Sequence, residues 1–303
     1  MLSTGRVGTK FMEAAFADQG YRAFHENLYD GEPGSAIILY TQMLGDMWFR
    51  DRAAYYALDS DFARPYVKAV LDAIDTGNNT HRVWKNGLFS RKVESLSDRV
   101  VIHTGHRLTA ATPLVQREAE KQGLTVKTLI LFRNPIKTIH AIYNVESPPG
   151  PSVIPYRNRP ASFFGDSTYR GAADIWANTY LMAQDQSIHL GNGNYRLLNL
   201  EKFSNDYDYA KDLFEFLNLP FQEERYHKFL HQILNQPLRS SKVDSTRNSH
   251  IFHDPKFSFS DNEIAEIYKR VKTLLSIYGI NWDKAINEYK VFHQQEKQEI
   301  GFV

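Results

Sequence analysis

The segment 126–132 (VKTLILF) is the strongest strand signal in the chain, and a turn and a helix follow it directly. Its largely apolar residues predict a strand. Arg133-Asn134-Pro135 then forms a turn, and a helix is expected from 136 to about 143. A strand, a turn and a helix in this order are the unit of a parallel α/β sheet, whose binding sites lie at the carboxyl ends of the strands.

The rest of the sequence continues this alternation of short apolar runs and amphipathic segments. A capping box, Ser260-x-x-Glu263, starts a further helix whose apolar stripe to Tyr278 we expect in the core. We expect irregular structure at 21–33 and 147–170, whereas 36–49 fits either a buried helix or a strand and a turn. The remaining expected elements are strands at 99–103 and 194–200, and helices at 8–19, 62–76, 113–122, 172–190, 207–217, 222–234 and 282–295.

These elements predict the fold class. We expect a three-layer α/β protein with a central, mainly parallel sheet flanked by helices. The length of 303 residues fits one large α/β domain or two small ones, and we interpret 1–303 as a single domain. In this interpretation, 283–303 is a peripheral helix or tail at the C-terminus.

The first turn of the chain has the form of a phosphate cradle. Gly5 and Gly8 permit backbone conformations and close approaches that a side chain would block. A glycine-containing loop that leads into a helix start directs backbone N–H groups and the positive end of the helix dipole at an anion. Full charges and hydroxyl donors surround this loop, contributed by Arg6, Lys10, Ser3, Thr4 and Thr9.

The cradle differs from an ordinary ATP or GTP site. Gly5 and Gly8 are three residues apart and no Gly-Lys-Ser/Thr follows, so the Walker A pattern and its Mg²⁺ ligand are absent. A phosphate loop normally follows a buried strand, yet only Met1 and Leu2 precede Ser3. We therefore expect a very short first strand, or a given sequence that lacks the true beginning of the chain.

Charge and cysteine content restrict the classes of partner. The net charge of +1 gives no bulk attraction for nucleic acid, so any anion site must be local. The absence of cysteine excludes disulfides, thiolate metal sites and a cysteine nucleophile, and suits a reducing cytoplasm. No stretch has the apolar length of a membrane span, and His250-x-x-His253 lacks a third metal ligand. We expect a cytoplasmic protein without a metal.

Four features in a fixed order resemble the sulfotransferase family, which uses 3′-phosphoadenosine 5′-phosphosulfate (PAPS) as sulfuryl donor. They are the G-R-x-G-T loop, a strand ending in His-x-Gly-His, a strand ending in Arg-Asn-Pro, and a late basic stretch. The resemblance covers most of the chain, from Ser3 to about Tyr278, and 3–11 and 128–143 match best. It implies a P-loop NTPase-like fold, and it implies transfer of a sulfuryl group from PAPS to a hydroxyl or amine of a small-molecule or carbohydrate acceptor.

The resemblance also implies roles for individual residues. Arg133 matches the arginine that grips the 3′-phosphate, and Thr138 is a substitute for the serine that the family usually has where Ala141 stands here. Lys242 and Arg247 match a basic loop that closes over the nucleotide. The 5′-phosphosulfate loop is formed by Gly5, Arg6, Val7, Gly8, Thr9 and Lys10, of which Arg6 and Lys10 neutralise the leaving phosphate oxygens. Lys10 stands where the family commonly has a second threonine, so this position differs from the family's pattern.

The acceptor needs a base that takes its proton as the new O–S bond forms. His106 fits the family's histidine best, with Thr104 in place of the usual lysine, and His103 is the alternative. A carboxylate base is a third possibility, for which Glu118 and Glu120 lie in the next helix.

Two other functions remain open from the sequence. One is a P-loop phosphoryl transferase that uses ATP, although neither Ile102-His103 nor Leu131-Phe132 is followed by an aspartate for Mg²⁺. The other is a sulfotransferase-like protein that binds nucleotide or glycan without turnover. The sequence does not identify the acceptor, because its aromatic residues fit a binding pocket and a core equally well. These residues are Tyr156, Phe163, Phe164 and Trp176.

Overall fold

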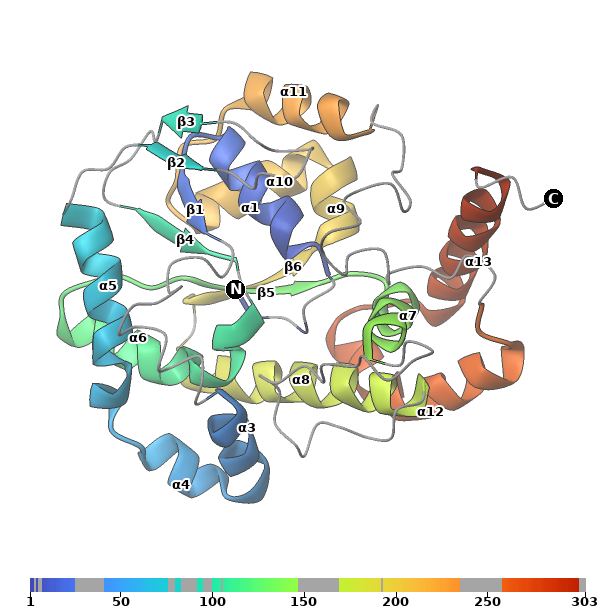
Figure 1. Cartoon of the computed structure of the whole chain (residues 1–303), viewed down its shortest axis with the longest axis horizontal. Coiled ribbons are helices and arrows are strands. Elements are labelled where there is room, and N and C mark those ends of the chain that lie inside the picture. Colours follow the sequence, from blue (N-terminus) through green and yellow to red (C-terminus); the bar gives the residue numbers. More distant parts are fainter. Residues whose placement is uncertain are drawn as a thin grey trace.

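The computed structural model describes residues 1, 2, 4, 7–24, 41–75, 80–82, 92–94, 100–104, 106–146, 169–191, 193–234 and 258–299. The chain is a mostly helical α/β protein in which short strands lie between two groups of helices (Figure 1). Parallel pairing was expected from the alternation of strands and helices. The pair formed by 22–24 and 101–103 and the pair formed by 128–132 and 195–199 are both parallel.

The strands within the described residues form three two-stranded sheets. β1 (Arg22–Phe24) pairs in parallel with β4 (Val101–His103), with Phe24 opposite His103. β5 (Thr128–Phe132) pairs in parallel with β6 (Tyr195–Asn199), from Thr128 opposite Tyr195 to Phe132 opposite Asn199. β2 (Thr80–Arg82) and β3 (Lys92–Glu94) form a separate antiparallel pair.

The first two residues of the chain connect the two parallel pairs. The Leu2 N–H donates to the Leu129 carbonyl at 2.8 Å, and the Leu131 N–H donates to the Leu2 carbonyl at 2.9 Å. On the other side, the Met1 amino group donates to the His103 carbonyl at 2.8 Å. The N-terminus accordingly lies between β4 and β5 in Figure 1. Leu2 forms a single parallel bridge with Ile130, and each parallel pair is two strands wide among the described residues.

One group of helices covers the upper side of the strands in Figure 1: α1 (Thr9–Asp18), α9 (Leu200–Asn205), α10 (Tyr207–Phe216) and α11 (Glu223–Leu234). Leu129 and Leu131 face this group and join a buried apolar cluster with Phe16 and Phe214. Their neighbours Ile130 and Phe132 belong to the cluster on the opposite side. This alternation is what a strand buried on both faces requires.

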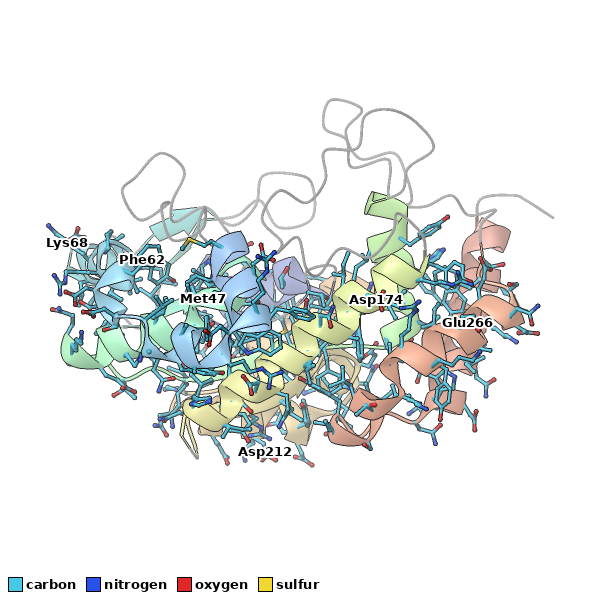
Figure 2. The ribbon with its side chains drawn as sticks, turned by 90° about the horizontal axis from the view of Figure 1, so that it is seen from below. Met47, Phe62, Lys68, Asp174, Asp212 and Glu266 are labelled. Atoms are coloured by element: carbon cyan, nitrogen blue, oxygen red, sulfur yellow. The ribbon has the colours of Figure 1, made fainter. Side chains whose placement is uncertain are left out.

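The opposite side carries two further clusters. The first unites α7 (Pro135–Glu146), α8 (Tyr169–His189), α12 (Asp261–Ile277) and α13 (Trp282–Glu299). The second unites α3 (Thr41–Arg50), α4 (Arg52–Ala57), η2 (Ser60–Ala63), α5 (Arg64–Asp75), η3 (His106–Ala111) and α6 (Thr112–Lys121). Figure 2 shows α8 crossing this face, with Asp174 on α8 beside α12. Asp174 pairs there with Arg270 of α12 at 2.6 Å.

Several sequence expectations need correction. Residues 22–24 were expected in an irregular stretch but form β1, because pairing with β4 supplies the hydrogen bonds that the local sequence does not suggest. The helix at 282–299 was expected to be peripheral, yet Ala285 and Tyr289 lie buried in its first half. The ambiguous segment 36–49 is helical where it is described, as α3. The short helices α4 and α9 were not expected.

Other expectations are confirmed. The capping box is present, with the Ser260 hydroxyl accepting from the Glu263 N–H at 3.3 Å and the Ser260 N–H donating to the Glu263 carboxylate at 2.7 Å. The apolar stripe behind it is buried, except that Tyr268 is 41% exposed. The strands expected at 99–103, 126–132 and 194–200 appear as β4, β5 and β6 with slightly narrower bounds.

Candidate anion site at the strand ends

Gly8 is the N-cap residue of α1 and has a left-handed backbone, with φ 95° and ψ 26°. A Cβ at this position would lie 2.5 Å from Cδ2 of Leu200, the first residue of α9. The left-handed backbone favours glycine here, and a Cβ would in addition force the Leu200 side chain to shift.

The N-terminus of α1 has no side-chain cap and no acidic residue in its first turn. The first-turn N–H groups of a helix have no intrahelical acceptor, and the helix dipole adds positive potential at this end. Thr9 is buried here, and the Val7 side chain is buried in the apolar cluster beneath α1. Val7 is thus available to an anion only through its backbone. For Lys10 the structure describes the backbone, and Gly5 and Arg6 lie outside the described residues.

Arg133 follows β5 and is half-buried. Its Nε donates to Oγ1 of Thr138 at 3.3 Å, and that hydroxyl donates to the Asn134 carbonyl at 3.0 Å. Thr138 is fully buried on the first turns of α7. The Thr138 hydroxyl is therefore used inside the protein, and it holds the guanidinium of Arg133 in place rather than presenting itself to a ligand.

Asn134 fixes the turn that carries Arg133. Its side-chain carbonyl accepts from the N–H groups of Ile136 at 3.0 Å and Lys137 at 3.2 Å, which caps α7. Its amide nitrogen donates to the Ala285 carbonyl at 2.9 Å, and its backbone N–H donates to Glu201 at 2.9 Å. The turn is thereby tied to α13 and to the residues that follow β6. Such anchoring gives Arg133 a defined position.

Tyr180 on α8 connects the first loop with the turn after β5. Its hydroxyl donates to the Leu131 carbonyl at 2.7 Å and is hydrogen-bonded to Thr4. Burial raises the pKa of Tyr180 well above its usual value, while the Thr4 hydroxyl and the charge of Arg133 act in the opposite direction. Tyr180 therefore stays neutral, as a donor at the base of the site. Sequence analysis missed this residue, although Trp176 and Tyr180, one helical turn apart, already marked an aromatic face.

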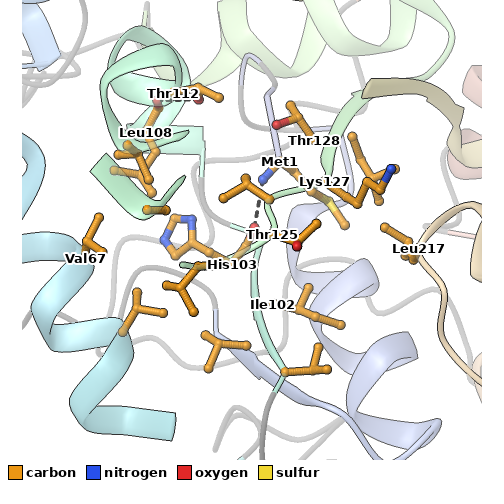
Figure 3. A pocket seen from close by; sticks show the side chains of 18 of the residues that line it. Met1, Val67, Ile102, His103, Leu108, Thr112, Thr125, Lys127, Thr128 and Leu217 are labelled. Carbon is orange, nitrogen blue, oxygen red and sulfur yellow. Dashed lines mark hydrogen bonds between the residues drawn. The ribbon is translucent and has the colours of Figure 1, made fainter. Parts of the chain in front are cut away.

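The three candidate bases differ in their surroundings. His106 is the first residue of η3, two positions after Thr104, and the structure describes its backbone. His103 lines a cavity on the α5 side of β4, with its ring 6.3 Å from that of Tyr66 (Figure 3). Glu118 is fully buried in an ionic network with Arg64 at 3.1 Å, which makes it structural. Glu120 is exposed and accepts a hydrogen bond from Gln116 at 2.8 Å.

Some expected site residues lie outside the described residues. These are Lys242 and Arg247 of the late basic stretch, and Tyr156, Phe163 and Phe164 of the proline-rich segment. Trp176 is described and is completely buried in the core. In the part of the chain that the structure describes, no three His, Asp or Glu side chains gather as they would around a metal ion. Among the same residues, no helix combines the length and apolar character that a membrane crossing requires.

Comparison with known proteins gives a similarity to solved structures but none to family models or curated sequences. No family model matches the chain, and no curated protein matches its sequence. Among solved structures, the chain is similar to the sulfotransferase domain from the curacin biosynthetic pathway, with a TM-score of 0.44 and 14% sequence identity. The alignment covers 92% of this chain and 96% of that domain. At this TM-score and identity, the similarity by itself establishes neither the fold family nor the function.

Proposed function

We propose that this protein is a sulfotransferase with a P-loop-like anion site. It would transfer a sulfuryl group from PAPS to a hydroxyl or amine of a small-molecule or carbohydrate acceptor. The observation that carries the proposal is the convergence of two anion-binding elements at one edge of the strands. The uncapped start of α1 follows Leu2, and Arg133 follows the adjacent strand β5.

The two elements suit the two ends of a doubly charged nucleotide. The start of α1, with a glycine that brings the loop against Leu200, offers backbone N–H groups to a 5′-phosphosulfate. Arg133, held by Thr138, offers a planar guanidinium to a 3′-phosphate. Tyr180 spans the distance between them through Thr4 and the end of β5.

The donor supplies an activated sulfuryl group on a phosphate leaving group. The acceptor oxygen or nitrogen forms a bond to sulfur as the bond between sulfur and the phosphate oxygen breaks, which leaves 3′-phosphoadenosine 5′-phosphate. Charge develops on the departing oxygen, and the N–H groups at the start of α1, with Arg6 and Lys10, are the groups assigned to stabilise it. The proton of the acceptor goes to a base, for which we assign His106.

The strand ends do not suit the main alternative, an ATP-dependent phosphoryl transferase. Thr104 follows β4 and Arg133 follows β5, so a carboxylate for Mg²⁺ is missing at both positions. Glu201 after β6 is engaged by the Asn134 N–H. These residues favour a reaction that proceeds without a nucleotide-bound Mg²⁺.

Calorimetric titration tests the donor site. We expect the protein to bind 3′-phosphoadenosine 5′-phosphate without Mg²⁺ and more tightly than ADP or ATP. Arg133→Ala should weaken this binding by about tenfold to hundredfold, because it removes a charge-assisted contact to the 3′-phosphate, and should leave the weaker ADP binding unchanged. Arg196→Ala is the matched control, since Arg196 lies near the start of β6 and bonds to the Asp212 carbonyl at 2.6 Å.

Each result has a clear meaning for the proposal. Preference for ATP with Mg²⁺ would replace the sulfotransferase with a phosphoryl transferase. Tight binding of the 3′-phosphorylated nucleotide, with no product formed from PAPS across an acceptor panel and no effect of His106→Ala, would identify a binding protein without turnover. Equal losses in Arg133→Ala and Arg196→Ala would show that Arg133 has no special role.

A further inference from the structure

α13 packs beside α7, the helix that starts directly after the turn of Arg133 (Figure 1). The Lys137 ammonium lies 5.1 Å from the centre of the Phe292 ring, and the ring centres of His140 and Tyr289 are 5.6 Å apart. A helix that was expected to be peripheral therefore lies against the first turns of the helix behind Arg133.

Asn134 is the residue through which α13 reaches this turn. The amide nitrogen of its side chain donates to the Ala285 carbonyl at 2.9 Å and to Oε2 of Glu288 at 3.1 Å. Ala285 and Glu288 are one helical turn apart, so both acceptors lie on the same face of α13. The Asn134 side chain is thus bonded to α13 by two acceptors.

The other end of the same amide belongs to α7. Its oxygen accepts from the N–H groups of Ile136 and Lys137, which have no acceptor inside the helix. The start of α7 therefore requires an oxygen at one end of the side chain, and α13 requires a nitrogen at the other. Only an amide supplies both, and a carboxylate at position 134 would place an oxygen against two acceptors.

The backbone of Asn134 connects this arrangement to the guanidinium. The Asn134 carbonyl accepts from the Thr138 N–H at 3.1 Å and from the Thr138 hydroxyl at 3.0 Å. The same hydroxyl accepts from Nε of Arg133 at 3.3 Å. Asn134 is only 6% exposed, so water does not replace these bonds readily. A continuous chain of hydrogen bonds therefore leads from Glu288 to Arg133.

We propose that Glu288 is a positioning residue of the candidate anion site, and that through Asn134 it keeps the Arg133 guanidinium in the orientation that a 3′-phosphate requires. The identity of the ligand rests on the proposed function, whereas the link from Glu288 to Arg133 does not. A guanidinium that is already ordered loses less conformational freedom when the phosphate binds, so the link contributes to affinity without touching the ligand.

The size of the effect follows from the surroundings of Glu288. Its carboxylate makes a charge-assisted bond to the amide, but its side chain is 36% exposed and Lys284 lies 3.8 Å away, so solvent and a second charge weaken it. The Ala285 carbonyl still holds the amide when the carboxylate is removed. We therefore expect a partial loss of affinity and not an abolished site.

The first test measures nucleotide affinity by calorimetry. Glu288→Ala should weaken the binding of 3′-phosphoadenosine 5′-phosphate by about threefold to tenfold and leave the binding of ADP, which lacks the 3′-phosphate, unchanged. Glu288→Gln keeps an oxygen that accepts from Asn134 and should lose at most about twofold. Asn287→Ala, an exposed neighbour on the same helix, is the control and should change neither affinity. Equal losses for both nucleotides, or no loss, would overturn the proposal.

The second test needs no nucleotide. In protein labelled with 15N-arginine, the Nε–H signal of Arg133 is identified by its absence in Arg133→Lys. We expect its heteronuclear NOE to fall in Glu288→Ala and to be retained in Glu288→Gln and Asn287→Ala, because only the first variant removes the acceptor from Asn134. An unchanged NOE in Glu288→Ala would overturn the link. A wild-type protein without preference for the 3′-phosphorylated nucleotide would overturn the proposed function instead, and a fall in the NOE would still support the link.

An exchange of the two side-chain types tests the contact itself. Asn134→Asp should lose the preference for the 3′-phosphorylated nucleotide, because the new oxygen faces the Ala285 carbonyl and the Glu288 carboxylate. Asn134→Asp combined with Glu288→Gln should recover part of this preference, since the glutamine amide donates to the aspartate. Asn134→Asp combined with Asn287→Ala should recover none. Equal recovery in the two double variants would overturn the proposal.

Discussion

At the scale of single residues, the candidate site depends on positions where one side-chain type is required. Gly8 is the clearest, because its left-handed backbone and the contact with Leu200 act together. Arg133 is next, because Thr138 and the Asn134 turn give its guanidinium a fixed place. Val7 and Thr138, also expected to bind the donor, serve the site from within the core.

Gly8→Ala should lower the free energy of unfolding by about 2–4 kcal/mol, from backbone strain and from the clash with Leu200. Gly123→Ala is the matched control, since Gly123 also has a positive φ of 77° but open space around its Cα. We expect it to cost only about 1–2 kcal/mol in urea unfolding. Leu200→Ala should recover part of the loss in the Gly8→Ala background and none in the Gly123→Ala background. Equal costs for the two glycine variants would contradict the close approach of α9.

At the scale of elements, α6 is joined to η2 and α5 by a buried carboxylate. Glu118 is fully buried and accepts from Arg64 at 3.1 Å, Ser60 at 3.2 Å and Gln122 at 3.4 Å. Burial alone would raise the pKa of the Glu118 carboxyl, but these hydrogen bonds and the Arg64 charge outweigh burial and lower the pKa. The network holds η2, α5 and α6 in place beside β4.

The lowered pKa of Glu118 predicts a loss of stability in acid. A carboxyl whose pKa is lower in the folded state contributes its stabilisation above its ordinary pKa of about 4.3, and loses it as the pH falls toward the folded pKa. Glu118→Gln should lower the free energy of unfolding at pH 7 by about 1–3 kcal/mol. It should also flatten the decrease in thermal midpoint below pH 5. Glu120→Gln, which removes an exposed carboxylate from the same helix, is the control. An unchanged acid profile in Glu118→Gln would exclude this role for the network.

At the scale of the whole molecule, the two parallel pairs are joined through Met1 and Leu2. The two helical groups therefore pack on two strand pairs that only the backbone hydrogen bonds of Met1 and Leu2 connect among the described residues. The candidate anion site lies next to this junction, so the stability of the junction should affect the site.

The Met1 amino group predicts that stability rises with pH. Because its pKa falls from 8.0 to about 5 on folding, the unfolded chain binds more protons than the folded chain between these values. The free energy of unfolding should increase from pH 5 to pH 8, by at most about 4 kcal/mol for three pKa units. Acetylation of Met1 should remove this part of the dependence and keep the bond to the His103 carbonyl. If the acetylated protein retains the same slope, the Met1 amino group is not its cause.

The sequence by itself determined the elements whose signals are local. The apolar run of β5, the capping box before α12 and the glycine after α6 depend on hydrogen bonds and backbone angles within a few residues, so their pattern predicts them. The glycine before α1 is also a local signal, because the order of residues around Gly8 predicts a glycine-containing turn at a helix start.

Only the tertiary structure decided which segments meet. β1 has no strong strand pattern of its own and exists through pairing with β4, and the first half of α13 is buried because α7 and Phe259 pack against it. Tyr180 lies far in sequence from both Thr4 and Arg133, and it reaches them because α8 crosses beneath β5. Such contacts arise from the complementarity of whole helix and strand surfaces, which no local pattern of residues specifies.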